Sequence, residues 1–394
     1  MTEVAERRRS SPRALDAVAL VAFVALGLPD GVLGVAWPSI RADFDRSVPA
    51  LGILLAAQTV GYLLATAANG ALVGRLGTGR LLVSAAGLAV VGFISFTTTT
   101  SWLLLGIASL AVGTAAGMVD AGLNAHVAVH HGRRAMGLLH AAFGIGATAG
   151  PLLVTTMLAA DRGWRSAYGF VAVLQGLLLG AFLLTRAHWR AAPADVPGTD
   201  AGGEVHPRLR GSLVLTMATF FVYTGFEISS GQWAFSLLTE ERDFDATSAG
   251  LWVAAYWGAL TVGRLVMAVA ADLAGAATVL GWATAGALAG AILLWLDVLG
   301  TGVLGLPVMG LCLAPVFPTL VSLTPERLGT ERAAHAIGYQ LTAAGVGAAA
   351  LPGAVAVLIG VGGLATLGPA LVAMAVGLVV LNLVSQLVAG QKPC

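Results

Sequence analysis

Charged residues are scarce in this sequence of 394 residues: Asp, Glu, Lys and Arg together make up 10% of the chain, whereas hydrophobic residues make up 57%. A soluble domain carries roughly 25% charged residues, so this composition argues against an ordinary soluble protein and indicates a membrane protein. The formal net charge is +1, which leaves no basic field suited to nucleic acid. We therefore expect the lipid bilayer, and no nucleic acid, as a partner.

Cysteine is also scarce, and a nucleotide-binding motif is missing. The two cysteines, Cys312 and Cys394, provide neither a disulfide framework nor a metal cluster. No loop of the form G-x-x-x-x-G-K-[ST] occurs, so we do not expect ATP to drive the protein. The sequence predicts no enzyme activity, no cofactor and no metal.

Apolar segments fill most of the chain, and about twelve of them approach the 20 residues that a helix needs to cross the hydrocarbon core. The predicted fold class is an all-α membrane protein with twelve transmembrane helices. An amino-terminal stretch, ERRRSSPR, precedes the first apolar run as in a signal peptide, but that run has a counterpart in the second half, so we expect it to remain as a helix. The predicted segments are 16–38, 50–72, 80–99, 103–128, 135–158, 165–186, 211–237, 248–270, 277–297, 299–322, 334–359 and 363–388.

Basic residues are distributed unevenly between the two sets of loops. Most lie at the amino terminus, in the even-numbered loops or at the carboxyl terminus. The exceptions in odd-numbered loops are Arg41, Arg46, Arg162, Arg165 and Arg242. The positive-inside rule therefore predicts a multi-pass protein of the cell membrane with both termini in the cytoplasm.

A repeat of about 200 residues divides the chain. ADFDRS at 42–47 is echoed by RDFDAT at 242–247, and a second pair of similar stretches aligns His140 with Gln340. The charged, Pro- and Gly-rich stretch between the halves reads as a cytoplasmic linker. We predict one six-helix bundle at 1–186, a linker at 187–210 and a second bundle at 211–394, as in transporters whose repeats rock around a site near the midplane.

The stretch GALVGRLGTGRLL at 70–82 is similar to the signature loop between helices 2 and 3 of the major facilitator superfamily. The acidic residue usual at its fifth position is Gly74 here. The second half carries a partial echo, GRLVMAVAADLAG. This resemblance implies the major facilitator fold and alternating access. Arg75 and Arg80 are the gating candidates that follow from it. Arg264 lies inside an apolar segment near its cytoplasmic end, where it either snorkels to the interface or forms a gating pair with Asp272 or with an acid of a neighbouring helix.

Three acidic residues lie deep inside apolar segments: Asp30, Asp120 and Glu227. An ionised carboxylate at the bilayer centre costs at least about 3 kcal/mol on insertion scales, so their presence needs a reason. One interpretation is that they face a wet cavity and bind and release a proton, or help to hold sodium, during transport. The alternative is that each is protonated or paired with arginine and only ties helices together.

Asp120 and Asn124 lie four residues apart and therefore share one face of the fourth helix. An acid on helix 1 combined with an acid-x-x-x-Asn pattern on helix 4 resembles the fucose permease branch of the superfamily, the proton-coupled symporters of fucose, galactose and glucose. The resemblance implies that Asp120 carries the proton and that Asp30 contacts the sugar. Asp120 is shorter than the glutamate more usual at that position.

Other polar residues inside the segments are candidates for binding a solute. Gln232 and Trp233 lie near Glu227 on the seventh segment, where stacking and hydrogen bonds suit a sugar; a tryptophan near a helix end also fits the interfacial belt. The remaining candidates, for which a hydrogen bond between helices is the structural alternative, are His140, also a possible proton relay, Gln340, Gln58 and Tyr339.

The sequence as a whole predicts a monomeric secondary transporter that imports a sugar or similar polyhydroxy solute with a proton, or with sodium. A second hypothesis is proton-coupled efflux of amphipathic drugs or metabolites, because GATAGP at 146–151 resembles the core of an antiporter signature. A third is a transporter-like receptor that moves nothing.

Overall fold

The computed structural model describes residues 12–130, 133–189, 207–270, 275–328 and 330–390. Within these residues the protein is helical and has no strand, and twelve helical spans are long and apolar enough to cross a membrane. The predicted fold class is therefore confirmed.

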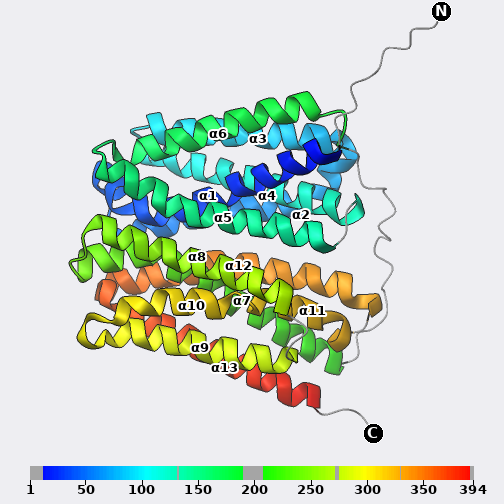
Figure 1. Ribbon diagram of the computed structural model, residues 1–394, viewed down its shortest axis with the longest axis vertical. Helices are drawn as coiled ribbons and strands as arrows, with labels where there is room; N and C mark the ends of the chain where they lie inside the picture. The colour runs from blue at the N-terminus through cyan, green and yellow to red at the C-terminus, as the bar shows by residue number, and fades with distance from the viewer. Residues whose placement is uncertain (1–11, 131–132, 190–206, 271–274, 329, 391–394) are drawn as a thin grey trace, which may run out of the picture.

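The helices form two groups that lie one above the other in Figure 1. The first group packs through contacts such as α1 with α5, α2 with α4 and α3 with α6, and the second through contacts such as α7 with α12, α8 with α10 and α9 with α13. The first group consists of α1 (Pro12–Asp43), α2 (Leu51–Leu76), α3 (Thr78–Thr98), α4 (Trp102–His130), α5 (Arg133–Ala159) and α6 (Gly163–Thr185). The second consists of α7 (Pro207–Ser236), α8 (Ala246–Ala270), α9 (Ala276–Leu296), α10 (Gly305–Leu313), α11 (Val316–Leu328), α12 (Thr330–Gly362) and α13 (Leu367–Gly390).

The tenth span differs from its prediction as one helix over 299–322. It covers Gly302–Arg327 and is divided into α10 and α11. The break falls at Pro315, which lies between the two helices. Proline has no backbone N–H to donate and its ring obstructs the preceding turn, so the helix is interrupted there.

The junction between the halves also begins differently from the prediction. Helix α7 starts at Pro207, four residues before the predicted boundary at 211. Proline is favoured in the first turn of a helix because the N–H that it lacks would be unpaired there anyway. Residues 190–206 of the predicted linker lie outside the described residues.

Small residues explain how helices within a half approach closely. A Cβ atom on Gly146 of α5 would lie 2.0 Å from the carbonyl oxygen of Val24 on α1. Only glycine permits backbones to come this near, as expected where helices pack without a hydrophobic driving force between them. The close packing of α5 on α1 therefore requires glycine at position 146.

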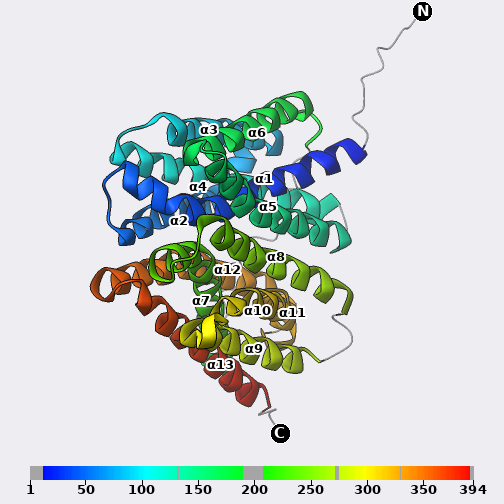
Figure 2. The same cartoon turned by 60° about the vertical axis from the view of Figure 1, so that its left-hand side comes forward.

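The two halves meet through α1 with α7, α2 with α12 and α5 with α8, and Figure 2 shows α5 beside α8 and α2 beside α12. We call the end of the molecule that carries loops 44–47, 160–162 and 242–245 the closed end, and the opposite end, where α1 begins and α13 finishes, the termini end. At the closed end Arg41 forms an ion pair with Glu240 across the halves. A Cβ atom on Gly360 would lie 3.2 Å from the ring of Pro49, so α12 also touches the other half there.

The hydrophobic core also shows where the two halves are in contact. One buried cluster contains residues of both halves, including Trp37, Trp164 and Trp233. A second cluster, which includes Phe23 and Leu123, contains residues of the first half alone. The apolar contact between the halves is thus continuous towards the closed end.

Candidate functional site

Asp120 on α4 is held by two hydrogen bonds. The Tyr62 hydroxyl of α2 donates to Oδ2 at 2.5 Å, and Nδ2 of Asn124 donates to Oδ1 at 2.8 Å. Helices α2 and α4 can bring these groups together because Gly117 faces α2, where a Cβ atom would lie 2.5 Å from the carbonyl oxygen of Tyr62. Both oxygens of the carboxyl group therefore have fixed partners.

Asp30 on α1 lies near both halves. The other two acids singled out in the sequence, Asp120 and Glu227, lie within electrostatic range of Asp30. The backbone carbonyl of Asp30 accepts a hydrogen bond of 2.8 Å from Nε2 of Gln232 on α7. Gly34, one turn further along α1, packs against the backbone of Gln232. This acid therefore lies where the first helices of the two halves meet.

Glu227 on α7 forms an ion pair with Arg264 on α8. Nη2 of Arg264 lies 3.2 Å from each carboxylate oxygen. The Tyr223 hydroxyl donates to the same carboxylate, and the Tyr256 hydroxyl donates to the backbone carbonyl of Glu227 at 2.8 Å. Of the two pairings that we considered for Arg264, the structure places it on an acid of a neighbouring helix; Asp272 lies outside the described residues.

His140 on α5 lies within electrostatic range of Asp120 and of Arg264. Its side chain is exposed, and its ring meets Phe23 edge-on with centroids 5.9 Å apart. Its charge interacts with Asp120 of the first half and with Arg264 of the second. The exposed side chain of His140 therefore lies at the boundary between the two halves.

Gln340, the repeat counterpart of His140, has different surroundings. It is fully buried, its Oε1 accepts a hydrogen bond of 3.0 Å from Thr324, and its Nε2 donates one of 3.1 Å to Thr216. These bonds tie α12 to α11 and α7. Tyr339 is 56% exposed, and Gln58 is half-buried with no side-chain hydrogen bond to the residues that the structure describes.

Several buried polar atoms of the predicted binding residues have no hydrogen-bond partner within the described part of the chain. They are Oδ1 of Asn124, Oε1 of Gln232 and Nε1 of Trp233. Trp233 itself is fully buried in the core that joins the halves. Because buried polar atoms are nearly always paired, unpaired ones mark unused hydrogen-bonding capacity.

The predicted gating arginines Arg75 and Arg80 are exposed at the termini end. Gly74 beside them has no atom within 4 Å of an added Cβ. Neither arginine has an ion-pair partner among the residues described, and the position where the signature has an acid offers none. The charge clamp of the superfamily signature is thus not formed here by the described residues.

Sequence reasoning missed the tyrosines of the site. Tyr62 binds Asp120, while Tyr223 and Tyr256 bind Glu227. A signal was present for one of them, because Tyr223 precedes Glu227 by four residues and so shares its helix face. No comparable signal relates Tyr62 to Asp120, which lies 58 residues away.

Comparison with known proteins gives matches along most of the chain. The sequence profile of the Major Facilitator Superfamily matches residues 19–352. Similar curated proteins include Bypass of stop codon protein 6 of Saccharomyces cerevisiae, 24% identical over 63% of this chain, and sodium-dependent glucose transporter 1A of Mus musculus, 25% identical over 62%. An uncharacterized MFS-type transporter of Yersinia pestis is 25% identical over 62% of this chain.

These alignments cover 55%, 65% and 63% of the lengths of the three relatives, in the same order. The family profile, in contrast, includes eleven of the twelve spans at least in part, ending within α12. Together with the twelve helical spans in two groups, this match shows that the chain belongs to the Major Facilitator Superfamily of membrane transporters.

Proposed function

We propose that the protein is a secondary active transporter that moves a sugar or similar polyhydroxy solute together with a proton by alternating access. The observation that carries this proposal is the cluster around Asp30 and Asp120, in which two membrane-embedded acids, one with both its oxygens bonded, lie within electrostatic range of each other at the meeting of the halves. In this proposal Asp120 carries the proton and Asp30 contacts the solute.

The surroundings of Asp120 support a role as proton carrier. Its hydrogen-bond partners among the described residues, Tyr62 and Asn124, are neutral, so neither cancels the charge that ionisation places on Asp120. Glu227, in contrast, is already paired with Arg264. An acid whose charge is not cancelled by a permanent partner is suited to binding a proton and releasing it.

The unpaired polar atoms support a solute with several hydroxyl groups. Asn124 and Gln232 each have a buried amide oxygen that no described residue pairs with, one in each half of the molecule. A hydroxyl group can donate to such an oxygen and accept from a neighbouring N–H, so a polyol that lies between the halves would pair with both. As the halves rock around this site, the contacts of the polyol with each half form and break, which in this proposal couples solute binding to alternating access.

The name of one relative bears on the solute and on the cation. The mouse protein is named a sodium-dependent glucose transporter. The name is consistent with a sugar as the solute, and it requires that sodium be tested beside the proton.

The test is uptake into proteoliposomes that contain the purified protein. With an inward proton gradient and no sodium, we expect hexose uptake with proton influx. A membrane potential of 100 mV supplies about 2.3 kcal/mol per charge, which corresponds to about 50-fold accumulation with one proton. Uptake that follows a sodium gradient and ignores pH would replace the proton by sodium, and no hexose movement with either gradient would refute the proposal.

Two variants separate the roles of the acids. Asp120→Asn is expected to abolish accumulation while hexose binding survives, whereas Asp30→Asn is expected to weaken binding itself. Calorimetry at two pH values measures both effects. Asp45→Asn is the matched control, because Asp45 is exposed in the loop after α1 and its φ of 51° is one that asparagine adopts readily.

A further inference from the structure

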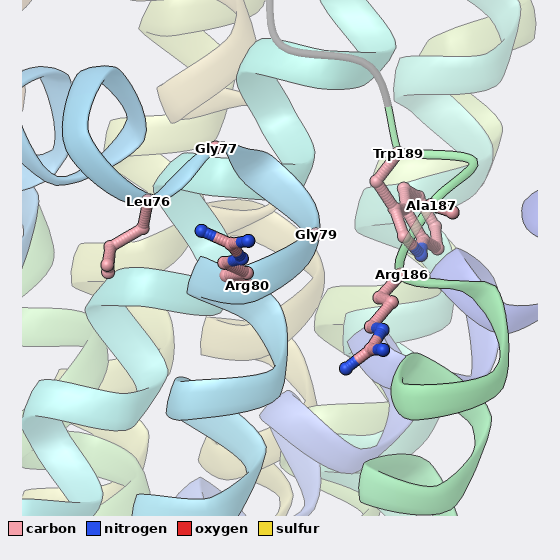
Figure 3. Close-up of a pocket in the computed structure, with 7 residues that line it drawn as sticks. All are labelled: Leu76, Gly77, Gly79, Arg80, Arg186, Ala187 and Trp189. Carbon is pink, nitrogen blue, oxygen red and sulfur yellow. The ribbon is translucent and has the colours of Figure 1, made fainter.

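A pocket of about 390 Å³ lies at the termini end, away from the acids of the central cluster. It is formed where the loop before α3 faces the end of α6, and Figure 3 shows Arg80 on the α3 side and Arg186 with Trp189 on the α6 side. The lining residues are Leu76, Gly77, Gly79, Arg80, Arg186, Ala187 and Trp189. Among the described residues that border this pocket, two therefore carry a positive charge and none is acidic.

The two sides of the pocket are held in place by direct packing. A Cβ atom on Gly79 would lie 2.0 Å from the carbonyl oxygen of Arg186, so the first turn of α3 touches the end of α6. Trp189 is 5% exposed, and its indole N–H donates to the hydroxyl of Thr185 at 2.9 Å. The backbone positions that carry Arg80 and Arg186 are consequently fixed relative to each other.

Both guanidinium groups of the pocket lack a partner among the described residues. Arg80 and Arg186 form no side-chain hydrogen bond or ion pair with any residue in the part of the chain that the structure describes, and both are exposed. Two like charges at one pocket repel each other unless an anion lies between them. Phosphate is an anion suited to these donors, because guanidinium groups bind phosphate in a bidentate manner.

The position of the pocket favours a phospholipid over a free phosphate compound. The spans Thr78–Thr98 and Gly163–Thr185 begin and end at this level, which is the edge of the hydrocarbon core. From here a stripe of exposed apolar side chains runs along one face of α6, with exposed fractions of 50% for Phe170, 65% for Val173, 69% for Leu177 and 85% for Leu184. An acyl chain attached to the phosphate would lie along this stripe.

We propose that this pocket binds the phosphodiester headgroup of an anionic phospholipid, with Arg80 and Arg186 on the phosphate and the acyl chains along α6. The headgroup bridges α3 and α6 at the termini end, where the described residues form no ion pair to do so. Binding neutralises the repulsion between the two arginines and fastens the first half to the lipid leaflet on that side.

The experiment titrates purified, detergent-solubilised protein with phosphatidylglycerol, phosphatidylcholine or inorganic phosphate, using native mass spectrometry for affinity and hydrogen exchange for location. We expect phosphatidylglycerol to bind and to slow exchange at residues 77–81. Each basic residue near an anionic headgroup contributes about fivefold in affinity, so Arg80→Gln or Arg186→Gln should weaken binding about fivefold and the double variant about 25-fold.

The matched control is a double variant at the closed end, Arg46→Gln with Arg162→Gln, which removes the same charge and should leave phosphatidylglycerol affinity within twofold. A double Arg80→Lys, Arg186→Lys variant keeps the charge but loses the bidentate donors, so its affinity for phosphatidylglycerol should lie between those of the wild type and the double glutamine variant. Wild-type affinity in the double glutamine variant, equal binding and protection by phosphatidylcholine, or full protection by inorganic phosphate alone would each overturn the proposal.

Discussion

Gly34 provides the most direct test of how the halves close, because it is the point where α1 meets the backbone of α7. An added Cβ would lie 2.7 Å from the carbonyl oxygen of Gln232 and 3.0 Å from its Cα. Both distances are well inside a contact distance of roughly 3.5 Å. The obstacle is backbone and cannot rotate away, so Gly34→Ala must push the two helices apart.

The magnitude follows from the cost of overpacking, which is about 1–3 kcal/mol. The clash exists only while the halves touch at the closed end. Gly34→Ala therefore destabilises that arrangement relative to one that is open there, and shifts the ratio of the two by a factor of about 5 to 150. The fold of each half is unaffected, since the contact lies between the halves.

The assay is a distance measurement by pulsed electron resonance between spin labels on Ser47 and Thr247. Both residues are exposed at the closed end, one in each half. The labels are attached to cysteines introduced at these positions after Cys312 and Cys394 have been replaced by serine. We expect Gly34→Ala to increase the population at long distance.

The control is Gly87→Ala on α3, where an added Cβ has nothing within 4 Å. It makes the same chemical change, including the gain in helix propensity, without a clash between the halves. The reasoning is refuted by a distance distribution in Gly34→Ala that matches the wild type, or by an equal change in Gly87→Ala.

The remaining predictions concern contacts inside and between the halves. Tyr62→Phe removes one of the two hydrogen bonds to the Asp120 carboxyl, and because a hydrogen bond to a charged group contributes about 1.5–3 kcal/mol, hexose uptake should fall by about tenfold or more and its pH profile should shift. The ion pair between Arg41 and Glu240 is partly exposed, so a double-mutant cycle with glutamine at each position, read by the same spin-label distances, should give a coupling of about 0.2–1 kcal/mol; zero coupling would show that the pair does not hold the closed end. Gln340→Leu removes two buried hydrogen bonds between helices, while the hydroxyls of Thr216 and Thr324 keep their bonds to carbonyls of their own helices. At about 0.5–1.5 kcal/mol for each lost bond, the free energy of unfolding should fall by about 1–3 kcal/mol, measured by thermal unfolding in detergent; an unchanged melting temperature would contradict a structural role.

Local sequence determined the number and approximate position of the membrane spans, because each helix in lipid must satisfy its own backbone hydrogen bonds and is therefore encoded by a continuous apolar run. The apolar run of the tenth span could not reveal the interruption at Pro315, since α10 and α11 together form one apolar segment that is long enough to cross the membrane. Proline inside a transmembrane segment is often tolerated, as Pro325 is within α11, and its effect depends on what neighbouring helices supply.

The candidate site was visible in the sequence as three acids and several amides in apolar surroundings, because polar groups there are costly and therefore conspicuous. Their partners were not visible. Glu227 with Arg264, and Asp120 with Tyr62, are pairs between different helices that are 37 and 58 residues apart. Helix rotation and the closeness of glycine-mediated crossings decide such pairs, and neither can be read from one sequence.

The sequence by itself thus determined that this chain is a membrane protein of twelve spans with a few acids placed where lipid disfavours them. Only the tertiary structure decided that Asp30 lies within electrostatic range of Asp120 and Glu227, that one of these acids is already paired with arginine, and that the two halves meet at one end. The apolar composition that makes a segment span the membrane is a property of that segment alone. The electrostatic environment of a buried acid, in contrast, is set by residues that the fold brings beside it from distant parts of the chain.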